Sequence, residues 1–225
     1  PYDRTVLFNS QNLHKRSLCI DIKRPGGREA LYAVARNVDV IVSNFTPGTL
    51  ARMGLSYETL SQENPGVIVV EMPAYGVSGP MSKLTALGPS MEFSSGMSAF
   101  IGYPDSGPTP TGPAYLDPIG GYNGAAAILT ALYDRKLTGK GQYVEVSQVE
   151  AAMPLVGNLI LACMENDQEP ARCGNSVPGY IVHDAFRCMG REQWVAIAIE
   201  NAEQWDVFAR LIETDLDATA DPAVL

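Results

Sequence analysis

The sequence predicts an α/β fold organised around a parallel sheet. Strand-like and helix-like segments alternate at short spacings through the first third of the chain, which is typical of parallel α/β units. The segment Val38–Val42 also has too little polarity for a strand with one face in water, and it suits a buried parallel sheet. These two observations lead to the α/β assignment.

The first predicted strand is Ser17–Ile22, an apolar and β-branched run that Pro25-Gly26-Gly27 ends. Ser56 is a suitable N-cap for a helix, because its hydroxyl can accept from the free N–H groups of the first turn. The elements expected after the first strand are a helix over Arg28–Arg36, a strand over Val38–Val42, a short helix through Leu50 and Met53, a helix over Tyr57–Gln62, and a strand over Val67–Met72.

The second half of the chain has longer helices and fewer strands. Leu84–Ala99 is predicted to be helical, with Gly88-Pro89 interrupting its start, and Ser147–Glu150 is a capping box that opens a helix with a kink at Pro154. The other expected elements are a helix over Tyr122–Lys136, a strand over Gln142–Val146, a polar linker over Glu165–Gly174, a strand over Gln193–Ile199 and a helix over Ala202–Ile212.

The stretch Thr111–Gly121 is a Pro/Gly-rich loop that leads into the helix predicted from Tyr122. Asp117 followed by Pro118 is the pair favoured at a helix start, with Asp as N-cap and Pro at the first helical position. We expect the Asp117 carboxylate at the positive end of a helix, where the field favours its ionised form as a nucleophile or an anchor. A cap with no catalytic role explains the same pair.

Composition excludes several classes of protein. The formal net charge of −9 disfavours general binding to nucleic acids or anionic membranes, and no apolar run is long enough for a membrane span. The four cysteines have no C-x-x-C spacing and there are only two histidines, so we expect reduced thiols, a cytoplasmic protein and no structural metal site.

In parallel sheets, ligands bind beyond the carboxyl ends of the strands. Here those ends are Lys23, Asn44-Phe45 and Ala74-Tyr75. No G-x-G-x-x-G or Walker A sequence follows any of them, so neither a dinucleotide fingerprint nor a P-loop is present. Ordinary loop residues at the ends of the sheet are the alternative interpretation.

Other catalytic constellations have little support. His14 and His183 do not lie beside a nucleophile-elbow sequence, so Ser-His-Asp and Cys-His chemistry are not indicated. Asp105 and Asp117 form a pair of acids of the kind that glycosidases use, but nothing in the sequence fixes their separation.

The order of motifs along the chain carries a resemblance to a known family. The motifs are Lys15-Arg16-Ser17-Leu18, Asp21-Ile22-Lys23, Asp39-Val40, Asn44-Phe45-Thr46-Pro47-Gly48, Arg52-Met53-Gly54-Leu55, Asn64-Pro65, Ala74-Tyr75-Gly76, Gly79-Pro80, Leu116-Asp117, Leu132-Tyr133, Thr138-Gly139-Lys140-Gly141-Gln142, Gly174-Asn175, Trp194–Ala198 and Gln204-Trp205. In this order they resemble the class III (formyl-CoA transferase type, CaiB/BaiF-like) coenzyme A transferases over nearly the whole chain.

The resemblance implies a Rossmann-like large domain, a smaller α/β domain and a homodimer of interlocked subunits. We accordingly expect a CoA-binding large domain over 1–150, a helix and linker over 151–175, and the start of the small domain over 176–225. It also implies transfer of CoA from an acyl-CoA to a carboxylic acid, with CoA as a substrate and no prosthetic group.

The resemblance assigns roles to individual residues. Asp117 matches the family's nucleophile, which forms a covalent aspartyl intermediate. The matching CoA contacts, expected to hold the nucleotide end, are Ile20, Asp21, Ile22, Lys23, Asn44, Phe45, Thr46 and Arg52, together with Ala74 and Tyr75 at the third strand end. Lys23 and Arg52 are the cations that an acidic protein needs beside phosphates.

The chain departs from the family pattern at several positions. Many relatives carry Pro-Gly-Tyr-Asp where this chain has Thr85–Gly88, and the family's racemases have a catalytic His at the position of Leu87. Gly174 and Gly179 are the nearest remnants of the glycine-rich loop over the site. The family's opening strand and helix and its return from the small domain are absent, so we expect further chain segments or a related subunit to complete the protein.

Two other functions remain open at this point. One is an acyl-CoA racemase or isomerase of the same family, which needs a base that the sequence does not supply. The other is a non-catalytic nucleotide-binding assembly subunit. Leu87, Met91, Phe93, Met97 and Phe100 could form an apolar acyl pocket, although their helical spacing equally suits a core.

Overall fold

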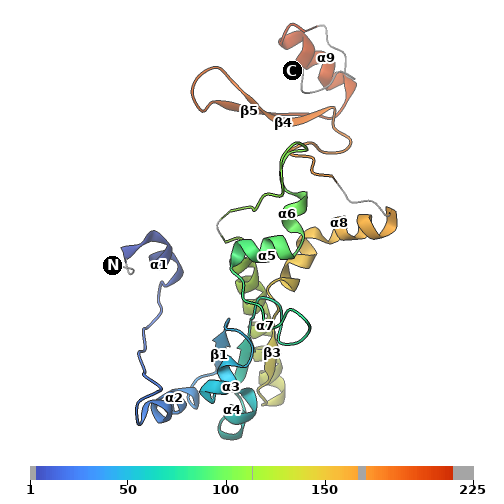
Figure 1. Ribbon diagram of the computed structural model, residues 1–225. Coiled ribbons are helices and arrows are strands. Elements are labelled where there is room, and N and C mark those ends of the chain that lie inside the picture. The colour runs from blue at the N-terminus through green and yellow to red at the C-terminus, as the bar shows by residue number, and fades with distance from the viewer. Residues whose placement is uncertain (1–3, 113, 167–170, 215–225) are drawn as a thin grey trace. The chain divides into compact units, whose positions relative to one another are not determined.

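The computed structural model describes residues 4–112, 114–166 and 171–214, which form a mixed α/β structure (Figure 1). Contacts divide the chain into two compact units. Unit 1 comprises Pro1–Pro73 and Gly124–Glu145, and unit 2 comprises Ala74–Asn123 and Val146–Leu225. These units do not follow the boundaries expected at 150 and 175, which remain predictions about domains.

The core of unit 1 is a three-stranded sheet of β1 (Val40–Ser43), β2 (Ile68–Glu71) and β3 (Tyr143–Glu145) in the order β1-β2-β3. Both pairs are parallel, which confirms the predicted parallel sheet. The central strand is the most buried, because it has a neighbour on each side and apolar side chains on both faces.

The helices of unit 1 are α1 (Val6–Gln11), α2 (Gly27–Ala35), α3 (Thr49–Met53), α4 (Tyr57–Glu63) and the second part of α7 (Leu116–Thr138). Val69 of β2 packs in one apolar cluster with Ala35, Leu50 and Leu60 of α2, α3 and α4. As predicted, Ser56 caps α4, and its hydroxyl accepts from the Thr59 N–H. A Cβ on Gly124 would overlap the end of the Met72 side chain, so α7 packs closely against the residue that follows β2.

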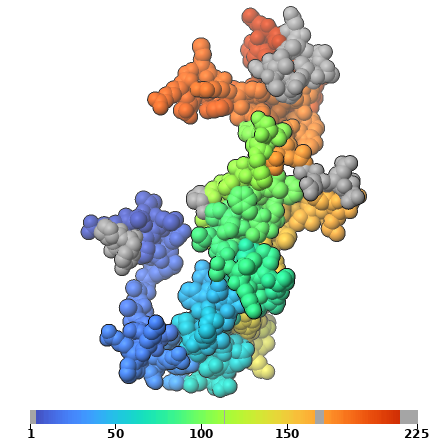
Figure 2. Space-filling view, in the orientation of Figure 1, coloured from blue at the N-terminus to red at the C-terminus, as the bar shows by residue number. Residues whose placement is uncertain are grey.

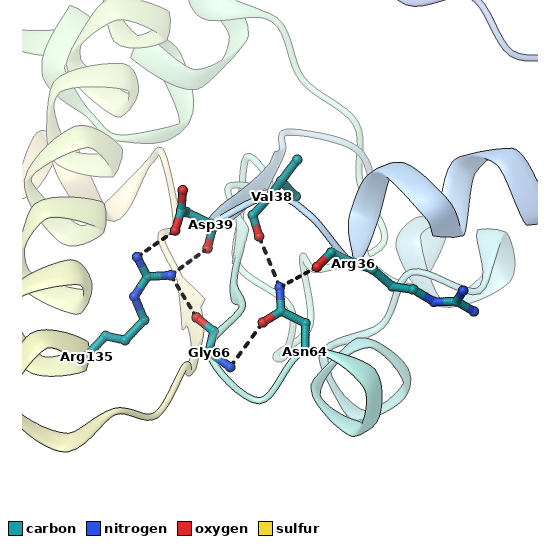
Figure 3. Close-up of polar contacts among 6 residues, drawn as sticks. All are labelled: Arg36, Val38, Asp39, Asn64, Gly66 and Arg135. Atoms are coloured by element: carbon teal, nitrogen blue, oxygen red, sulfur yellow. Dashed lines mark hydrogen bonds and ion pairs between the residues drawn. The ribbon is translucent and has the colours of Figure 1, made fainter.

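Polar side chains fix the amino ends of the strands. Arg135 of α7 donates to the carbonyl oxygens of Asp39 and Gly66, and Asn64 donates to the carbonyl oxygens of Arg36 and Val38 (Figure 3). These bonds join the segments that lead into β1 and β2 and thereby hold the two strands in register.

Unit 2 contains α5 (Gly88–Ser94), α6 (Met97–Phe100), the first turns of α7, the 3-10 turn η2 (Glu150–Ala152) and α8 (Met153–Asn166). Their core is an apolar cluster that includes Met91, Leu116 and Val156. The unit also has an antiparallel pair, β4 (Val182–Arg187) and β5 (Trp194–Ile199), with α9 (Ala202–Leu211) packed on it through Trp205. The β4–β5 ribbon is orange in Figure 2. Trp194, the first residue of β5, is exposed.

The first predicted strand is wrong. Ser17–Ile22 is extended and largely exposed, and no described residue pairs with it. The β-branched run has the right composition, but strand formation depends on a neighbouring strand. Asp21 instead shapes a turn into α2: its side chain accepts from the Lys23 N–H and its carbonyl accepts from the Arg24 N–H.

The start of α7 also differs from the prediction. The helix begins at Leu116 rather than Tyr122, so Asp117 lies inside the first turn and is not the cap. Leu116 is fully buried and anchors that turn. Pro118 fits there because the N–H groups of the first turn have no helical acceptor.

Smaller differences concern the other helices of unit 2. The predicted helix Leu84–Ala99 is two short helices, α5 and α6, separated at Gly96, whose φ of 79° is left-handed. Pro154 does not kink a helix, because it lies in the first turn of α8 after the η2 turn. Strand β4 was not predicted from the sequence. Residues 167–170 of the predicted linker and 215–225 of the expected small domain lie outside the described residues.

Candidate active site

Asp117 is exposed in the first turn of the 23-residue helix α7. The first backbone bond of the helix in this region runs from the Ile119 N–H to the Tyr115 carbonyl oxygen at 3.4 Å. Among the described residues, none forms a hydrogen bond or ion pair with the Asp117 carboxylate. It is therefore an accessible anion at the positive end of a long helix dipole, which suits a nucleophile as well as an anchor for a ligand.

The backbone at Gly88, the first residue of α5, supports the Asp117 carboxylate from one side. A Cβ placed on Gly88 would overlap Asp117 Oδ2 and would come within 2.7 Å of Ala114 Cα. Any larger residue at position 88 would displace the carboxylate or the loop before it.

Glu92, one turn further along α5, holds the loop that leads to Asp117. Its carboxylate is fully buried and accepts from the Thr111 N–H at 2.7 Å, from Thr111 Oγ1 at 2.9 Å and from the Tyr115 N–H at 3.3 Å. The sequence alone does not single out this residue. An isolated acid between Met91 and Phe93 is a weak signal, because it indicates that a buried Glu would need partners without naming them.

Ala74 and Tyr75 lie in unit 2 with Asp117. The Ala74 carbonyl accepts from the Val149 N–H at 3.0 Å, and the Tyr75 hydroxyl shares a 2.8 Å hydrogen bond with Ser94 of α5. Both residues pack against the apolar cluster that includes Met91 and Leu116. Helix α5 therefore contacts both the Tyr75 loop and the Asp117 turn.

The loop after β1 in unit 1 gathers a second set of the predicted residues. Asn44 and Phe45 are exposed, and Thr46 shares a 3.2 Å hydrogen bond with Thr49. Arg52 donates to Thr49 Oγ1 at 2.7 Å. No acidic side chain among the described residues pairs with Arg52, so its charge is available to an anion beside this strand end.

Ile20–Lys23 also belongs to unit 1 but is not joined to the Asn44–Arg52 loop by any hydrogen bond among the described residues. Lys23 is exposed in the turn before α2 and not at a strand end, which corrects the placement predicted from sequence. Asp21 pairs with Arg24 at 3.4 Å. Lys23 has no such partner in the described part of the chain.

The predicted apolar pocket is divided between core and surface. Met91 and Met97 are buried and Phe100 packs against them, so these three are core residues. Leu87 and Phe93 are exposed, at 76% and 51%. No group of described His, Cys, Asp or Glu residues has the geometry of a metal site, and no described helix is long and apolar enough to cross a membrane.

The sequence and fold of this chain are similar to those of known proteins. The sequence pattern of CoA-transferase family III matches residues 1–224. The chain is 31% identical over 194 residues to the acetyl-CoA:oxalate CoA-transferase of Acetobacter aceti, covering 85% of this chain and 50% of that protein. It is 35% identical over 155 residues to the formyl-CoA:oxalate CoA-transferase of Afipia carboxidovorans, covering 69% and 36%.

Among solved structures, a CaiB/BaiF family protein from Brucella suis matches with a TM-score of 0.82 and 27% identity, over 88% of this chain and 52% of that one. The mixed α/β structure with a parallel sheet is thus consistent with the CaiB/BaiF fold. The chain spans half or less of the length of these two curated relatives.

Proposed function

This chain belongs to CoA-transferase family III, and we propose that the protein containing it transfers CoA from an acyl-CoA thioester to a carboxylic acid, with Asp117 as nucleophile. The observation that carries the proposal is the exposed Asp117 carboxylate, which has no partner among the described residues and lies in the first turn of α7. Both relatives named above are CoA-transferases that use acyl-CoA and a carboxylate, which supports the same reaction class.

The proposed reaction begins with attack of the Asp117 carboxylate on the thioester carbonyl carbon. The C–S bond breaks, giving a mixed anhydride and the CoA thiolate. The thiolate then attacks the aspartyl carbonyl of the anhydride, which releases the donor acid and leaves an aspartyl-CoA thioester. The acceptor carboxylate attacks this thioester to give a second anhydride, and the thiolate attacks its acyl carbonyl to form the product and free Asp117.

The helix terminus assists this chemistry in one specific way. The negative charge on Asp117 is present before attack and is restored at the end, and the positive end of α7 stabilises it in both states. The role of Gly88 is steric, because its lack of a side chain leaves space for Oδ2. Neither contribution requires a metal or a prosthetic group.

For substrate binding, we propose that Arg52 and Lys23 bind the phosphates of CoA, with Ile20, Asp21, Ile22, Asn44, Phe45 and Thr46 around the nucleotide and Ala74 and Tyr75 nearer the thioester. The exposed guanidinium of Arg52, which donates to Thr49 and has no acidic partner among the described residues, supports this for the loop after β1. We also propose a cytoplasmic enzyme with a Rossmann-like large domain, a smaller α/β domain and an interlocked homodimer, completed by further chain segments or a related subunit.

The covalent role of Asp117 is tested by comparing the intact protein with its Asp117→Asn variant in a thioester exchange assay. A panel of acyl-CoA donors and carboxylic acids serves as substrate. Asn keeps the size of Asp, and the exposed Asp117 carboxylate forms no hydrogen bond among the described residues that the change would remove, so the variant is expected to fold normally. Mass spectrometry after incubation with acyl-CoA should find a modified Asp117 in the wild type and an unmodified residue in the variant.

The matched control is Asp105→Asn, because Asp105 is an exposed acid in the same unit and carries no proposed role. It should exchange thioesters at the wild-type rate. Near wild-type turnover of Asp117→Asn, with deamidation excluded, would remove the covalent role. Deuterium uptake at the α-carbon of a chiral acyl-CoA without CoA transfer would favour the racemase alternative instead.

A further inference from the structure

Glu92 has an environment that its helix alone does not explain. It is 0% exposed, and no described Lys or Arg forms an ion pair with it. A buried carboxylate is costly unless hydrogen bonds or a counter-charge replace its lost water. Here three donors offset that cost, and all three come from Thr111 and Tyr115.

The two donor residues are close to Asp117 in the chain. Thr111 lies six residues before Asp117 and Tyr115 two residues before it, and the intervening Leu116 is fully buried. The Glu92 hydrogen bonds and the Leu116 side chain therefore fix the chain on both sides of Ala114. The next residue, Asp117, is exposed, and its carboxylate forms no hydrogen bond or ion pair with the described residues, so its position depends on this support and on the close approach of Gly88.

Helix α5 makes a second contact with the same segment. Gly88 and Glu92 are four residues apart and therefore lie on one face of the helix. At Gly88 the absence of a side chain sets how closely Asp117 Oδ2 and Ala114 can approach. At Glu92 the hydrogen bonds keep the loop from moving away. The same face of α5 therefore determines both how near the loop can come to the helix, at Gly88, and how far it can move away, at Glu92.

We propose that Glu92 is a positioning residue of the active site, whose buried carboxylate holds Thr111 and Tyr115 and thereby sets the location of the Asp117 nucleophile. The inference rests on the proposed function of Asp117 for its catalytic consequence. Whether Glu92 restrains the loop can be measured without an assay of enzyme activity. Because correct placement of a nucleophile lowers the barrier to attack, loss of this hold should affect turnover more than binding.

The first test is Glu92→Gln in the intact protein. Gln has the same shape, but its NH2 group would face an N–H or O–H donor in place of an acceptor oxygen. Hydrogen exchange at the Thr111 and Tyr115 amides, read by mass spectrometry, should become at least ~10-fold faster, while exchange in β2 stays unchanged. In thioester exchange, kcat should fall by about 10- to 100-fold, with KM for the acyl-CoA within about twofold.

A second variant avoids any general effect on folding. Thr111→Val removes only the Oγ1 donor at an exposed position and keeps Glu92 in place, and it should lower kcat by roughly 3- to 10-fold. Glu203→Gln, an exposed Glu to Gln change on α9 in the same unit, is the control and should change neither exchange nor kcat.

The outcomes separate this inference from the proposed function. Unchanged amide exchange in Glu92→Gln would contradict the inference that the Glu92 hydrogen bonds restrain the loop. Faster exchange with wild-type kcat in both variants would overturn the positioning role. A rise in KM at unchanged kcat would assign Glu92 to binding instead and would also overturn it. If wild-type protein transfers no CoA with any substrate, the proposed function fails and amide exchange alone decides whether Glu92 fixes the loop.

Discussion

Arg135 and Asp39 form an ion pair of 2.8 Å between Arg135 Nη2 and Asp39 Oδ1, which joins α7 to the start of β1 (Figure 3). The same guanidinium donates to the Gly66 carbonyl oxygen at 2.9 Å, just before β2. Arg135 is 23% exposed and Asp39 is 78% exposed, so the carboxylate side of the pair is largely in water. Most of the stabilisation should therefore come from the bonds to backbone oxygens.

Replacing Arg135 by Met should lower the free energy of unfolding by about 2 kcal/mol, because Met keeps the apolar stem and loses the charged hydrogen bonds to Gly66 and Asp39. Asp39→Asn removes only the ion pair and should cost roughly 0–1 kcal/mol. Urea denaturation of both variants measures the difference. Equal losses in the two variants would assign the stabilisation to the ion pair instead.

Gly88→Ala should lower thioester exchange by more than about 10-fold, because the new Cβ overlaps Asp117 Oδ2 and the Ala114 backbone. Overpacking should also cost ~1–3 kcal/mol of stability. Gly107→Ala is the matched control, since a Cβ there meets no atom within 4 Å. Wild-type turnover in Gly88→Ala would show that Asp117 acts from another position.

Arg52→Ala should weaken CoA binding by ~1–3 kcal/mol through loss of a charge-assisted phosphate contact, and Lys23→Ala should have a smaller effect of the same sign. Titration calorimetry with CoA at two salt concentrations measures both. Lys140→Ala removes an exposed cation just before the amino end of β3, whereas the proposed site lies after a strand, and should leave CoA affinity unchanged. Unchanged affinity in Arg52→Ala and Lys23→Ala would contradict the proposed nucleotide site.

Because the pKa of Tyr143 in β3 is raised, we predict that the folded protein loses stability in alkaline solution when this phenol ionises. Burial raises the pKa of its phenol, and the hydrogen bond that it donates to Glu71 at 3.0 Å raises the pKa further, as do the charges of Glu71 and Glu145. A raised pKa contributes stability below the ordinary phenol pKa of about 10, and this stability is lost as the pH rises beyond it.

The comparison is between the wild type and Tyr143→Phe. Near pH 7 the variant should be less stable by about 1 kcal/mol, because Glu71 loses a donor. Above about pH 10 the wild type should lose stability with increasing pH more steeply than the variant. Denaturation at a series of pH values measures both slopes, and parallel slopes would contradict the role assigned to Tyr143.

The sequence by itself determined the elements whose signals are local. The Ser56 cap, the apolar strands β1 and β2 and the Asn201-capped helix α9 each depend on residues within a few positions of one another. The charge and position of Asp117 near a helix start are local in the same sense. The family membership followed from the order of many such short motifs, each of which is weak alone.

Tertiary structure decided what depends on residues far apart in the chain. Ser17–Ile22 has strand composition but no pairing strand among the described residues, and propensity cannot supply one. Glu92 reaches donors 19 and 23 residues away, and Gly88 approaches Asp117 across a similar interval. A single sequence records such residues without recording their contacts, because a buried charge or a close backbone approach is defined only once the chain has folded around it.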